Sequence, residues 1–328
     1  MKNIIVFGAS GGTGKYFVEY FKEHCTNPEY ELIAAGRRDT DFFERMGVRY
    51  VRMDITDKAA FSKLPQEVFA VVDLAGLMPA RMEGYNPYKY IDVNITGTLN
   101  ILEYCRKAKA DRILFAQSFG DIKDHGEDDP LLRVDMPRKF SFTSDHTVYV
   151  LTKNFAVDLI ENYHQLYGIK NFIFRLPNIY HYSANDGYYY VDGVKRKMGW
   201  RIILDHAIKG EDIEVWGDAS RVKDMIYVKD FCQMMYRAVF VDRDSGFYNV
   251  GTGIGTSLLD QIKGMIEVFG TDGKKSRIIM RPDKPNAPQY IMDISPAREE
   301  LGYKPEYSYI AMLEDMKNEM QKQDSIRN

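Results

Sequence analysis

The sequence has few cysteines, and they do not cluster. Its 328 residues include only Cys25, Cys105 and Cys232, which lie far apart in the chain. An odd number of cysteines at wide spacing, with no C-x-x-C pair, indicates neither a disulfide framework nor a zinc site. We therefore expect reduced thiols and no bound metal.

The sequence also lacks a long apolar run and an excess of basic residues. The apolar segment near the N-terminus, residues 4–7, is too short for a signal peptide or a membrane span, so we expect no membrane partner and a cytoplasmic location by default. Forty-four Lys and Arg against 47 Asp and Glu give a net charge of −3, without a basic block. This balance disfavours nucleic acid as a partner.

What the sequence does contain is a regular alternation of strand and helix patterns. A β-branched run at 4–7 leads into glycines, residues 15–24 have helical spacing, and residues 31–35 form a second apolar run. Strand, turn, helix and strand in this order make a βαβ unit. Further strand patterns follow at 48–53, 70–75, 113–116 and 171–174. The chain is predicted to adopt an α/β fold with a Rossmann, doubly wound parallel sheet.

A glycine-rich turn follows the first strand and opens the first helix. Glycines there permit a tight turn and let the backbone approach a pyrophosphate, while the helix N-terminus offers unpaired N–H groups to the anion. At the first βα turn this motif predicts dinucleotide binding. The residues that would cradle the phosphates are Gly8, Ser10, Gly11, Gly12, Thr13 and Gly14.

The end of the second strand bears on the choice between NAD and NADP. Arg37 and Arg38 stand where an NAD enzyme usually has a carboxylate, and two guanidinium groups suit a 2′-phosphate. Asp39 follows and is able to reach a hydroxyl instead. We predict NADP or NAD, with NADP favoured. Asp54 and Ile55, at the end of the third strand, are predicted to bind the adenine.

Two Tyr-x-x-x-Lys patterns occur, and only the second fits a catalytic helix. Tyr85 and Lys89 enclose Pro87, which argues against a regular helix there. Tyr149 and Lys153 lie near the start of a helical pattern over about 148–167, where residues four apart share a face.

A phenol beside an ammonium group suits proton transfer next to a hydride donor. A neighbouring Lys⁺ favours the phenolate, so we expect Lys153 to lower the pKa of Tyr149 and to bond the nicotinamide ribose. Tyr149 would then act as the general base. Ser118 follows the strand pattern at 113–116 and is predicted to bond the reacting oxygen.

The composition of the sequence changes after about residue 178. Residues 185–193 are polar, aromatic and glycine-flanked, which predicts a loop; Tyr188–Tyr190 within it would either cover a substrate or simply pack. Short strand patterns follow at 213–216 and 247–250. We predict an NAD(P)-binding Rossmann domain over 1–178, with some later segments returning to it. The remainder, 179–328, is predicted to form mainly a smaller α/β substrate-binding domain.

Taken in order, these motifs resemble the extended short-chain dehydrogenase/reductase family, the NAD-dependent epimerases, dehydratases and ketoreductases of nucleotide-sugars. The resemblance runs nearly end to end. It is carried by Gly8-x-x-Gly11-x-x-Gly14, Asp54-Ile55, 71–76 (VVDLAG), 94–98 (NITGT), Ser118, Tyr149-x-x-x-Lys153, 175–180 (RLPNIY), Arg221, 226–230 (IYVKD), 248–251 (YNVG), Arg281-Pro282 and 293–305.

The resemblance implies roles for residues that the motifs alone leave open. Residues 90–107 and 148–167 would form the interface of a homodimer. A nucleotide-sugar would be the substrate, with its reacting oxygen on Ser118 and its diphosphate on Asn178, Arg221 and Arg281. Further cofactor contacts would come from Leu74, Ala75, Gly76, Asn94 and Pro177.

The sequence departs from the family pattern at three places. Asp73 stands where a histidine is common, and Ala116 and Gln117 replace small hydroxyl residues before Ser118. Phe119-Gly120 stands where a sugar 4,6-dehydratase would have Asp-Glu. The missing acid and base argue against a dehydratase.

Three functions are compatible with these features. A C4 epimerase of a nucleotide-hexose, working through a transient 4-keto intermediate, is preferred because many members of the resembled group have that activity. An NADPH-dependent reductase of a 4-keto-deoxysugar nucleotide would use the same residues and is favoured by Arg37 and Arg38. A dinucleotide sensor without catalysis is disfavoured because Ser118, Tyr149 and Lys153 are all present.

Overall fold

A seven-stranded parallel sheet forms the centre of the computed structural model, which describes all residues except 80–82, 145, 183–186, 192, 272 and 328. The strand order is β14-β7-β5-β4-β1-β2-β3, and every neighbouring pair is parallel. The order reverses beside β1, as in a doubly wound fold. The strands are β1 (Lys2–Phe7), β2 (Tyr30–Gly36), β3 (Arg49–Arg52), β4 (Ala70–Asp73), β5 (Arg112–Ser118), β7 (Lys170–Leu176) and β14 (Ser245–Asn249).

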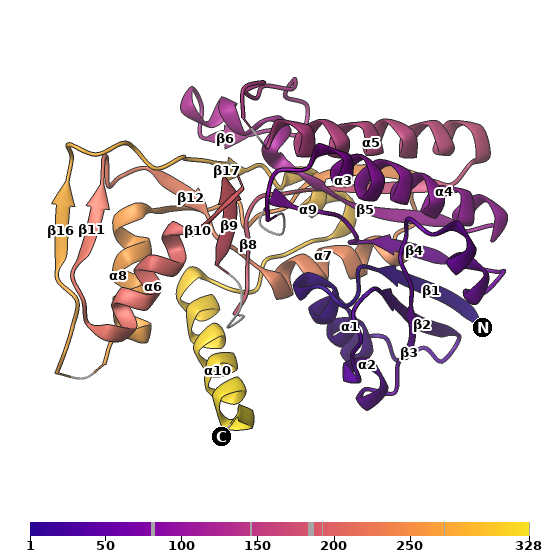
Figure 1. Cartoon of the computed structure of the whole chain (residues 1–328), viewed down its shortest axis with the longest axis horizontal. Coiled ribbons are helices and arrows are strands. Elements are labelled where there is room, and N and C mark those ends of the chain that lie inside the picture. The colour runs from indigo at the N-terminus through magenta and orange to yellow at the C-terminus, as the bar shows by residue number, and fades with distance from the viewer. Residues whose placement is uncertain (80–82, 145, 183–186, 192, 272, 328) are drawn as a thin grey trace.

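Helices cover both faces of this sheet, as Figure 1 shows. Alternate residues of each strand enter two separate apolar clusters, so Ile4 and Val6 face one layer while Ile5 and Phe7 face the other. Strands buried on both faces read as continuous apolar runs, which is how they were recognisable in the sequence. The predicted α/β fold with a Rossmann sheet is confirmed. The covering helices are α1 (Gly12–His24) and α7 (Val228–Phe240) on one face, and α4 (Gly97–Lys107) and α5 (Thr147–Tyr167) on the other.

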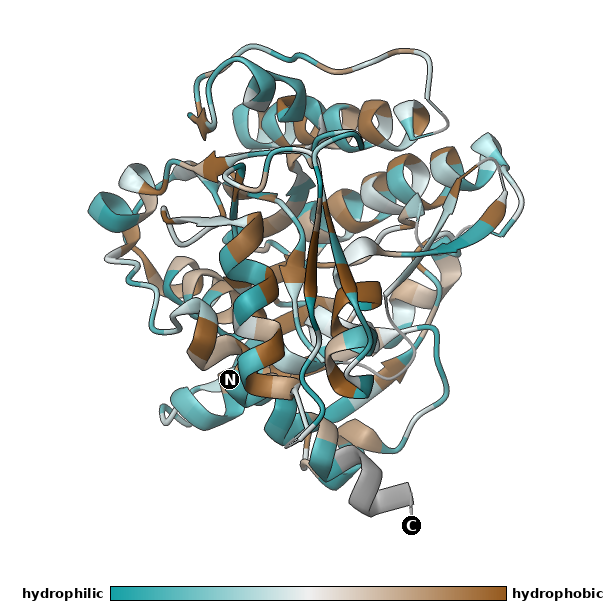
Figure 2. Ribbon diagram, turned by 90° about the vertical axis from the view of Figure 1, so that its left-hand side faces the viewer, coloured by the Kyte–Doolittle hydropathy of each residue, from teal (hydrophilic) through white to brown (hydrophobic). Residues whose placement is uncertain are grey.

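Several two-stranded sheets and helices form a second layer beyond the main sheet. Figure 2 shows its helices with alternating apolar and polar bands, the pattern of amphipathic helices. The pairs are β10-β9, β11-β16, β12-β15, β13-β8 and β17-β6. Their bounds are β6 (Leu131–Leu132), β8 (Ile179–Tyr180), β9 (Tyr188–Val191), β10 (Val194–Lys197), β11 (Ile213–Trp216), β12 (Val222–Asp224), β13 (Ile226–Tyr227), β15 (Gly255–Ser257), β16 (Ile278–Arg281) and β17 (Ile291–Met292).

The remaining α-helices differ widely in length. They are α2 (Phe42–Arg45), α3 (Pro87–Tyr90), α6 (Gly199–Lys209), α8 (Leu258–Phe269), α9 (Ser295–Leu301) and α10 (Tyr309–Arg327). None of the helices in the described residues is both long and apolar enough to cross a membrane.

One later segment crosses back into the main sheet. Strand β14 pairs in parallel with β7 over the register Ser245↔Asn171 to Asn249↔Arg175. Arg175 is buried there, and its guanidinium bonds the Asn249 side chain and the Asp121 carboxylate. The domain boundary predicted at residue 178 stays a prediction.

The loop predicted over 185–193 is wrong in part. Residues 185, 186 and 192 lie outside the described residues, but Tyr188–Val191 is a strand that pairs antiparallel with Val194–Lys197. Aromatic and β-branched residues favour extended backbone, so Tyr188–Val191 forms a strand. The flanking glycines had indicated a loop in place of this strand.

Candidate functional site

The glycine-rich turn has the geometry that a pyrophosphate requires. Gly8 has φ of +75°, and a Cβ on it would lie 2.6 Å from the backbone of Leu74 and Ala75. A Cβ on Gly14 would lie 2.4 Å from the Gly8 carbonyl oxygen, so the helix sits directly against the strand. Gly11 caps α1 without a side-chain hydrogen bond, which leaves the first N–H groups available to an anion.

Basic side chains gather beside this turn at the ends of β2 and β3. The Arg38 guanidinium donates to the Ser10 carbonyl at 3.0 Å, which ties it to the phosphate loop. Arg37 lies 3.6 Å from the Asp54 carboxylate. The Asp39 carboxylate forms an ion pair with the Arg52 guanidinium at 3.3 Å. Asp39 and Arg37 thus each have an ion-pair partner, and the side chains of Arg37, Arg38 and Asp39 are all exposed.

Asp54 and Ile55 lie where the sequence predicts the adenine. Burial raises the pKa of Asp54, but hydrogen bonds from Thr56 and the charge of Arg37 outweigh it, so the net pKa is lowered. Ile55 is buried and contacts Gly97 at the start of α4; a Cβ on that glycine would lie 2.6 Å from the Ile55 side chain. A charged acceptor beside an apolar wall is suited to an adenine ring and its amino group.

The loop after β4 is fastened to the catalytic helix through Asn94. Asn94 is buried in a π-helical segment, η3 (Ile91–Thr96), and its amide accepts from the Leu77 N–H at 2.7 Å and donates to the Leu77 carbonyl at 3.1 Å. The same amide donates to Thr152 Oγ1 at 3.1 Å. Such π segments often mark functional sites. Asn94 thus holds the loop containing Leu74, Ala75 and Gly76 against α5.

Tyr149, Lys153 and Ser118 are brought together at the carboxyl end of β5. Tyr149 and Lys153 share one face of α5, and Ser118, which ends β5, lies close enough to the Tyr149 phenol to lower its pKa. The Ser118 hydroxyl also accepts from the Gly120 N–H at 3.1 Å. The Lys153 ammonium lies 4.1 Å above the centre of the Phe115 ring. A phenol, a hydroxyl and a buried ammonium therefore lie together at the carboxyl end of β5.

The expectation that Lys153 lowers the pKa of Tyr149 is wrong for the protein alone. Burial raises the pKa of Tyr149 to about 12, and the Ser118 hydrogen bond opposes this only in part. Burial also lowers the pKa of Lys153 to about 8, against the charge of Asp73. The buried surroundings penalise both charged forms, and the ammonium sits over an aromatic ring rather than on the phenol.

Sequence reasoning missed two polar side chains that hold this arrangement. Thr152 accepts from Asn94 and donates to the Tyr149 carbonyl at 2.8 Å. Gln117 donates to Asn154 at 2.8 Å and accepts from the Ser118 N–H at 3.0 Å, which fixes β5 to α5. Polar residues on the inward face of a helix are the signal that would have found Thr152 and Asn154.

Of the residues predicted to bind a diphosphate, Arg221 and Arg281 lie in the second layer, whereas Asn178 closely follows β7 of the main sheet. Pro177 is buried after β7, and Asn178 beside it is exposed. Arg221 donates to the Ala287 carbonyl at 2.5 Å and pairs with Glu127 at 2.6 Å. Arg281 pairs with Glu214 at 2.6 Å and with Asp283. Both guanidinium groups are held by carboxylates, and their role toward a diphosphate stays a prediction.

The Tyr85–Lys89 pattern does not form a second dyad. Tyr85 precedes the short helix α3, whereas Lys89 lies within it. The side chain of Tyr85 is about half exposed.

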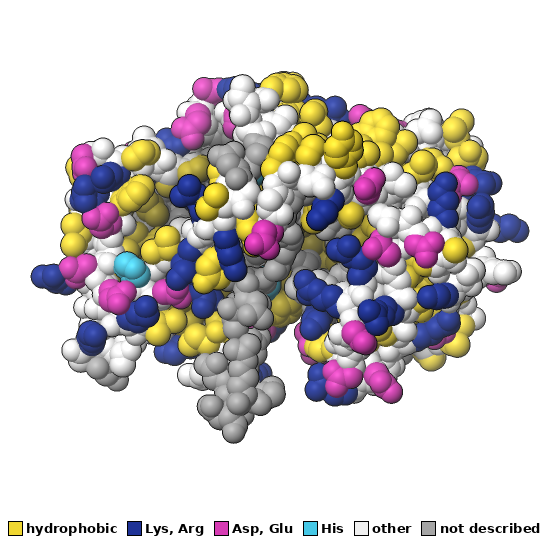
Figure 3. Space-filling view, viewed as in Figure 1, with side chains coloured by type: hydrophobic (Ala, Val, Ile, Leu, Met, Phe, Trp, Pro, Cys, Tyr) yellow, Lys and Arg dark blue, Asp and Glu magenta, His cyan; other side chains and the backbone are white. Residues whose placement is uncertain are grey.

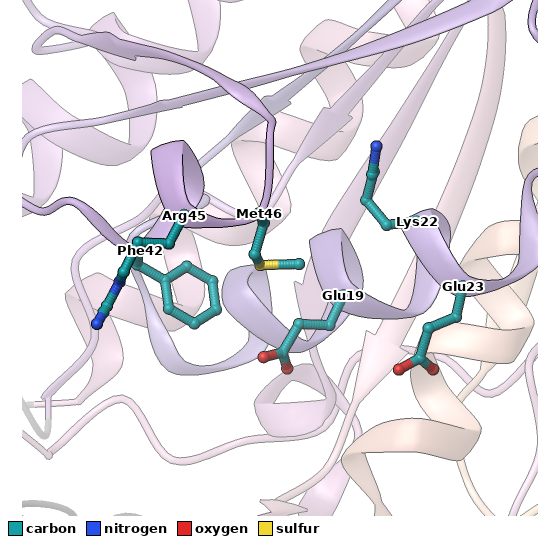
Figure 4. A pocket seen from close by; sticks show the side chains of 6 residues that line it. All are labelled: Glu19, Lys22, Glu23, Phe42, Arg45 and Met46. Carbon is teal, nitrogen blue, oxygen red and sulfur yellow. The ribbon is translucent and has the colours of Figure 1, made fainter. Parts of the chain in front are cut away.

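A pocket between α1 and α2 is separate from this site. Figure 4 shows three side chains from α1 and three from α2 and its C-terminal end around it. The predicted site residues do not line it, so the site is located by the phosphate loop and the strand ends instead. The lining residues are Glu19, Lys22, Glu23, Phe42, Arg45 and Met46.

A family model agrees with this architecture. The model of the NAD dependent epimerase/dehydratase family matches residues 4–251. The chain belongs to this family, whose members are NAD-dependent enzymes, and the resemblance stated from the motifs is confirmed.

Individual relatives cover almost the whole chain at low identity. A protein of Methanocaldococcus jannaschii, provisionally named a UDP-glucose 4-epimerase, is 29% identical over 315 residues, which cover 92% of this chain and 93% of that protein. The structure of a Thermotoga maritima UDP-glucose 4-epimerase with UDP-glucose has a TM-score of 0.79 at 23% identity and covers 98% of this chain and 99% of that one. A Thermus thermophilus UDP-glucose 4-epimerase in complex with NAD has a TM-score of 0.70 at 21% identity, covering 96% and 98%.

We predict that Gly14→Ala abolishes dinucleotide binding while the protein stays folded. The added Cβ would lie 2.4 Å from the Gly8 carbonyl oxygen, so α1 has to move away from the phosphate loop. Calorimetric titration with NAD⁺ and NADP⁺ measures the loss. Gly199→Ala is the matched control, since a Cβ there meets nothing within 4 Å. Binding of unchanged affinity in Gly14→Ala would contradict the assignment of this turn.

Proposed function

We propose that the chain is a nucleotide-sugar 4-epimerase. The observation that carries the proposal is the convergence of Tyr149, Ser118 and Lys153 beside a glycine turn that fits a pyrophosphate. The relatives named as UDP-glucose 4-epimerases support a UDP-hexose as the substrate. Phe119-Gly120 after Ser118 supplies no acid or base for water loss, which supports epimerisation over dehydration.

In this mechanism the protein moves one proton and holds the sugar in place. Ser118 and Tyr149 bond the C4 hydroxyl, and Tyr149 takes its proton as the carbon is oxidised. When bound, the nicotinamide cofactor supplies hydride acceptance, hydride return and a positive charge that favours the phenolate. The keto sugar then turns over between Tyr149 and the cofactor face, and Tyr149 returns the proton. Lys153 would bond the nicotinamide ribose when the cofactor is bound, and it supplies a positive charge to the site.

The diphosphate is expected to reach the second layer of the structure. Asn178 is exposed immediately beyond β7, and Arg221 and Arg281 carry guanidinium groups that suit phosphate oxygens. Each arginine already has a carboxylate partner, Glu127 for Arg221 and Glu214 for Arg281. On binding, the substrate diphosphate therefore replaces the carboxylate partners of these two arginines.

A 4-ketoreductase is the second candidate, and one observation favours it. Arg38 is anchored to the phosphate loop and Arg37 lies beside it, which supports NADP over NAD. A reductase that consumes NADPH would exchange its cofactor in every cycle, whereas an epimerase recycles it within one turnover. The same Tyr149 and Ser118 would serve both reactions.

We predict that Tyr149→Phe lowers kcat by about 10²–10⁴-fold and leaves cofactor affinity largely intact, because only the proton-transferring hydroxyl is removed. Turnover of UDP-glucose and UDP-galactose, followed by chromatography of the products, measures the effect. Tyr85→Phe, in the other Tyr-x-x-x-Lys pattern, is the control and keeps full activity. Full activity in Tyr149→Phe would refute the mechanism.

We also predict that freshly purified, denatured protein releases one nicotinamide dinucleotide per chain. An epimerase returns hydride to the same substrate and has no need to release its cofactor, so retention is expected. Mass spectrometry of the released material identifies NAD⁺ or NADP⁺ and any nucleotide-sugar. An empty protein that binds NADPH more tightly than NADH would favour the ketoreductase instead.

We propose in addition that the enzyme is a homodimer formed by α4 and α5. These two helices pack together and expose apolar side chains on one surface, where Figure 3 shows hydrophobic atoms gathered over α5. On α5, Leu151 and Phe155 are 43% and 47% exposed and lie one turn apart; Leu99 on α4 and Ile91 just before it are also exposed. Exposed apolar patches of this kind mark protein interfaces.

Accordingly, Phe155→Glu is expected to convert the dimer into monomers, because it places a charge in the centre of the apolar surface. Sedimentation velocity at micromolar concentration measures the mass. Ile254→Glu, at a more exposed apolar side chain outside α4 and α5, is the control that stays dimeric. A wild-type chain that sediments as a monomer would overturn the dimer proposal and leave the proposed epimerase activity unaffected.

A further inference from the structure

A carboxylate interrupts an otherwise apolar row across the main sheet. Asp73 pairs in register with Phe7 on β1 and with Phe115 on β5, so the three side chains lie on the same face of the sheet. Phe7 and Phe115 belong to the apolar cluster beneath α4 and α5. Asp73 is 0% exposed in this row. A buried carboxylate is costly unless a charge or hydrogen bonds compensate it.

Hydrogen bonds compensate Asp73 only in part. One oxygen accepts from the Ala75 N–H at 2.9 Å, whereas Oδ2 has no hydrogen-bond partner among the described residues. The Ala75 bond also shapes the loop that carries the predicted cofactor contacts. A single hydrogen bond does not compensate the charge of the buried Asp73 carboxylate, so a nearby cation has to balance that charge.

The cation is the ammonium of Lys153. It is buried on α5 and lies 4.1 Å above the ring of Phe115, the register neighbour of Asp73. A Cβ on Gly76, three residues after Asp73, would lie 3.7 Å from the Lys153 Nζ. The lysine thus reaches down from the helix to the strand end at which Asp73 is buried.

We propose that Asp73 is a positioning residue that keeps Lys153 protonated and directed toward the strand ends beneath Tyr149. The proposal rests on the proposed function and deepens it, since Lys153 supplies a positive charge to the site only while it is protonated. Asp73 touches neither the reacting atoms nor the phenol. It acts through the lysine.

The titratable groups around Lys153 give the sign of the effect. Tyr149 lies one turn before it on α5, Asp73 faces it from β4, and Cys105 on α4 faces Asp73. Burial lowers the pKa of Lys153 to about 8, and Asp73 raises it. Burial raises the pKa of Asp73 to about 6, and Lys153 lowers it. Both groups are charged between these values. Removing the Asp73 charge therefore moves the Lys153 pKa downward.

The experiment titrates Lys153 directly in the full-length protein. Lysine labelled with ¹³C at Cε reports its own ionisation by NMR, and Lys153→Met assigns the resonance. Asp73→Asn is expected to lower the Lys153 pKa by about one unit or more. The alkaline limb of the kcat/KM profile is expected to shift downward by the same amount. A Lys153 pKa that is unchanged in folded Asp73→Asn would overturn the proposal.

A matched control separates this effect from general destabilisation. Asp230 is also buried with a pKa raised to about 6, but its partners are the Glu306 and Tyr307 N–H groups. Asp230→Asn makes the same chemical change away from the lysine and is expected to leave its pKa unmoved. An equal Lys153 shift in Asp230→Asn would overturn the proposal.

The reciprocal variant covers a failure of Asp73→Asn to fold. Coupling is mutual, so Lys153→Met is expected to raise the pKa of Asp73 above about 6. ¹³C-labelled aspartate reports this titration, and an unchanged Asp73 pKa would count against the pairing. If wild-type protein shows the coupling but turns over no nucleotide-sugar, the proposed function fails while the pairing stands.

Discussion

The backbone contact between the ends of β1 and β4 is the constraint on which the site depends. Gly8 approaches the Leu74–Ala75 peptide so closely that no side chain fits between them. This contact puts the phosphate loop and the loop after β4 side by side at the point where the strand order reverses. The Ala75 N–H then turns back to Asp73. Through Asn94 and Thr152 the same loop is fixed to the Tyr149 backbone.

The strands could be predicted from the sequence because local signals were strong there. Apolar β-branched runs such as 4–7 have few alternatives to a buried strand, and Gly8 and Gly14 lie in backbone contacts too close for a Cβ. The pKa of Tyr149 was mispredicted because spacing places Lys153 on the same helix face but says nothing of Phe115, which holds the ammonium. The pairing of β9 with β10 was also not predicted. It joins residues 188–191 to residues 194–197, whereas the glycines that flank the first segment indicated a loop.

Long-range pairings were the other part that the sequence did not reveal. Arg221 and Arg281 were recognisable as candidate phosphate ligands, but their partners Glu127 and Glu214 are distant in the chain. These pairs hold both guanidinium groups in fixed orientations. Gln117, an unusual residue at its position, uses its amide to join β5 to α5 through Asn154.

The return of β14 to the edge of the main sheet bears on how the chain folds during synthesis. The edge strand beside β7 comes from residues 245–249, long after the other six strands have left the ribosome. Until then β7 has one unpaired edge, and the buried Arg175 lacks its Asn249 partner. A nascent chain ending near residue 178 therefore presents an open sheet edge to its neighbours, a site for chaperones or for association with other chains. The main sheet is completed only after strands β8 to β13 of the second layer have been made.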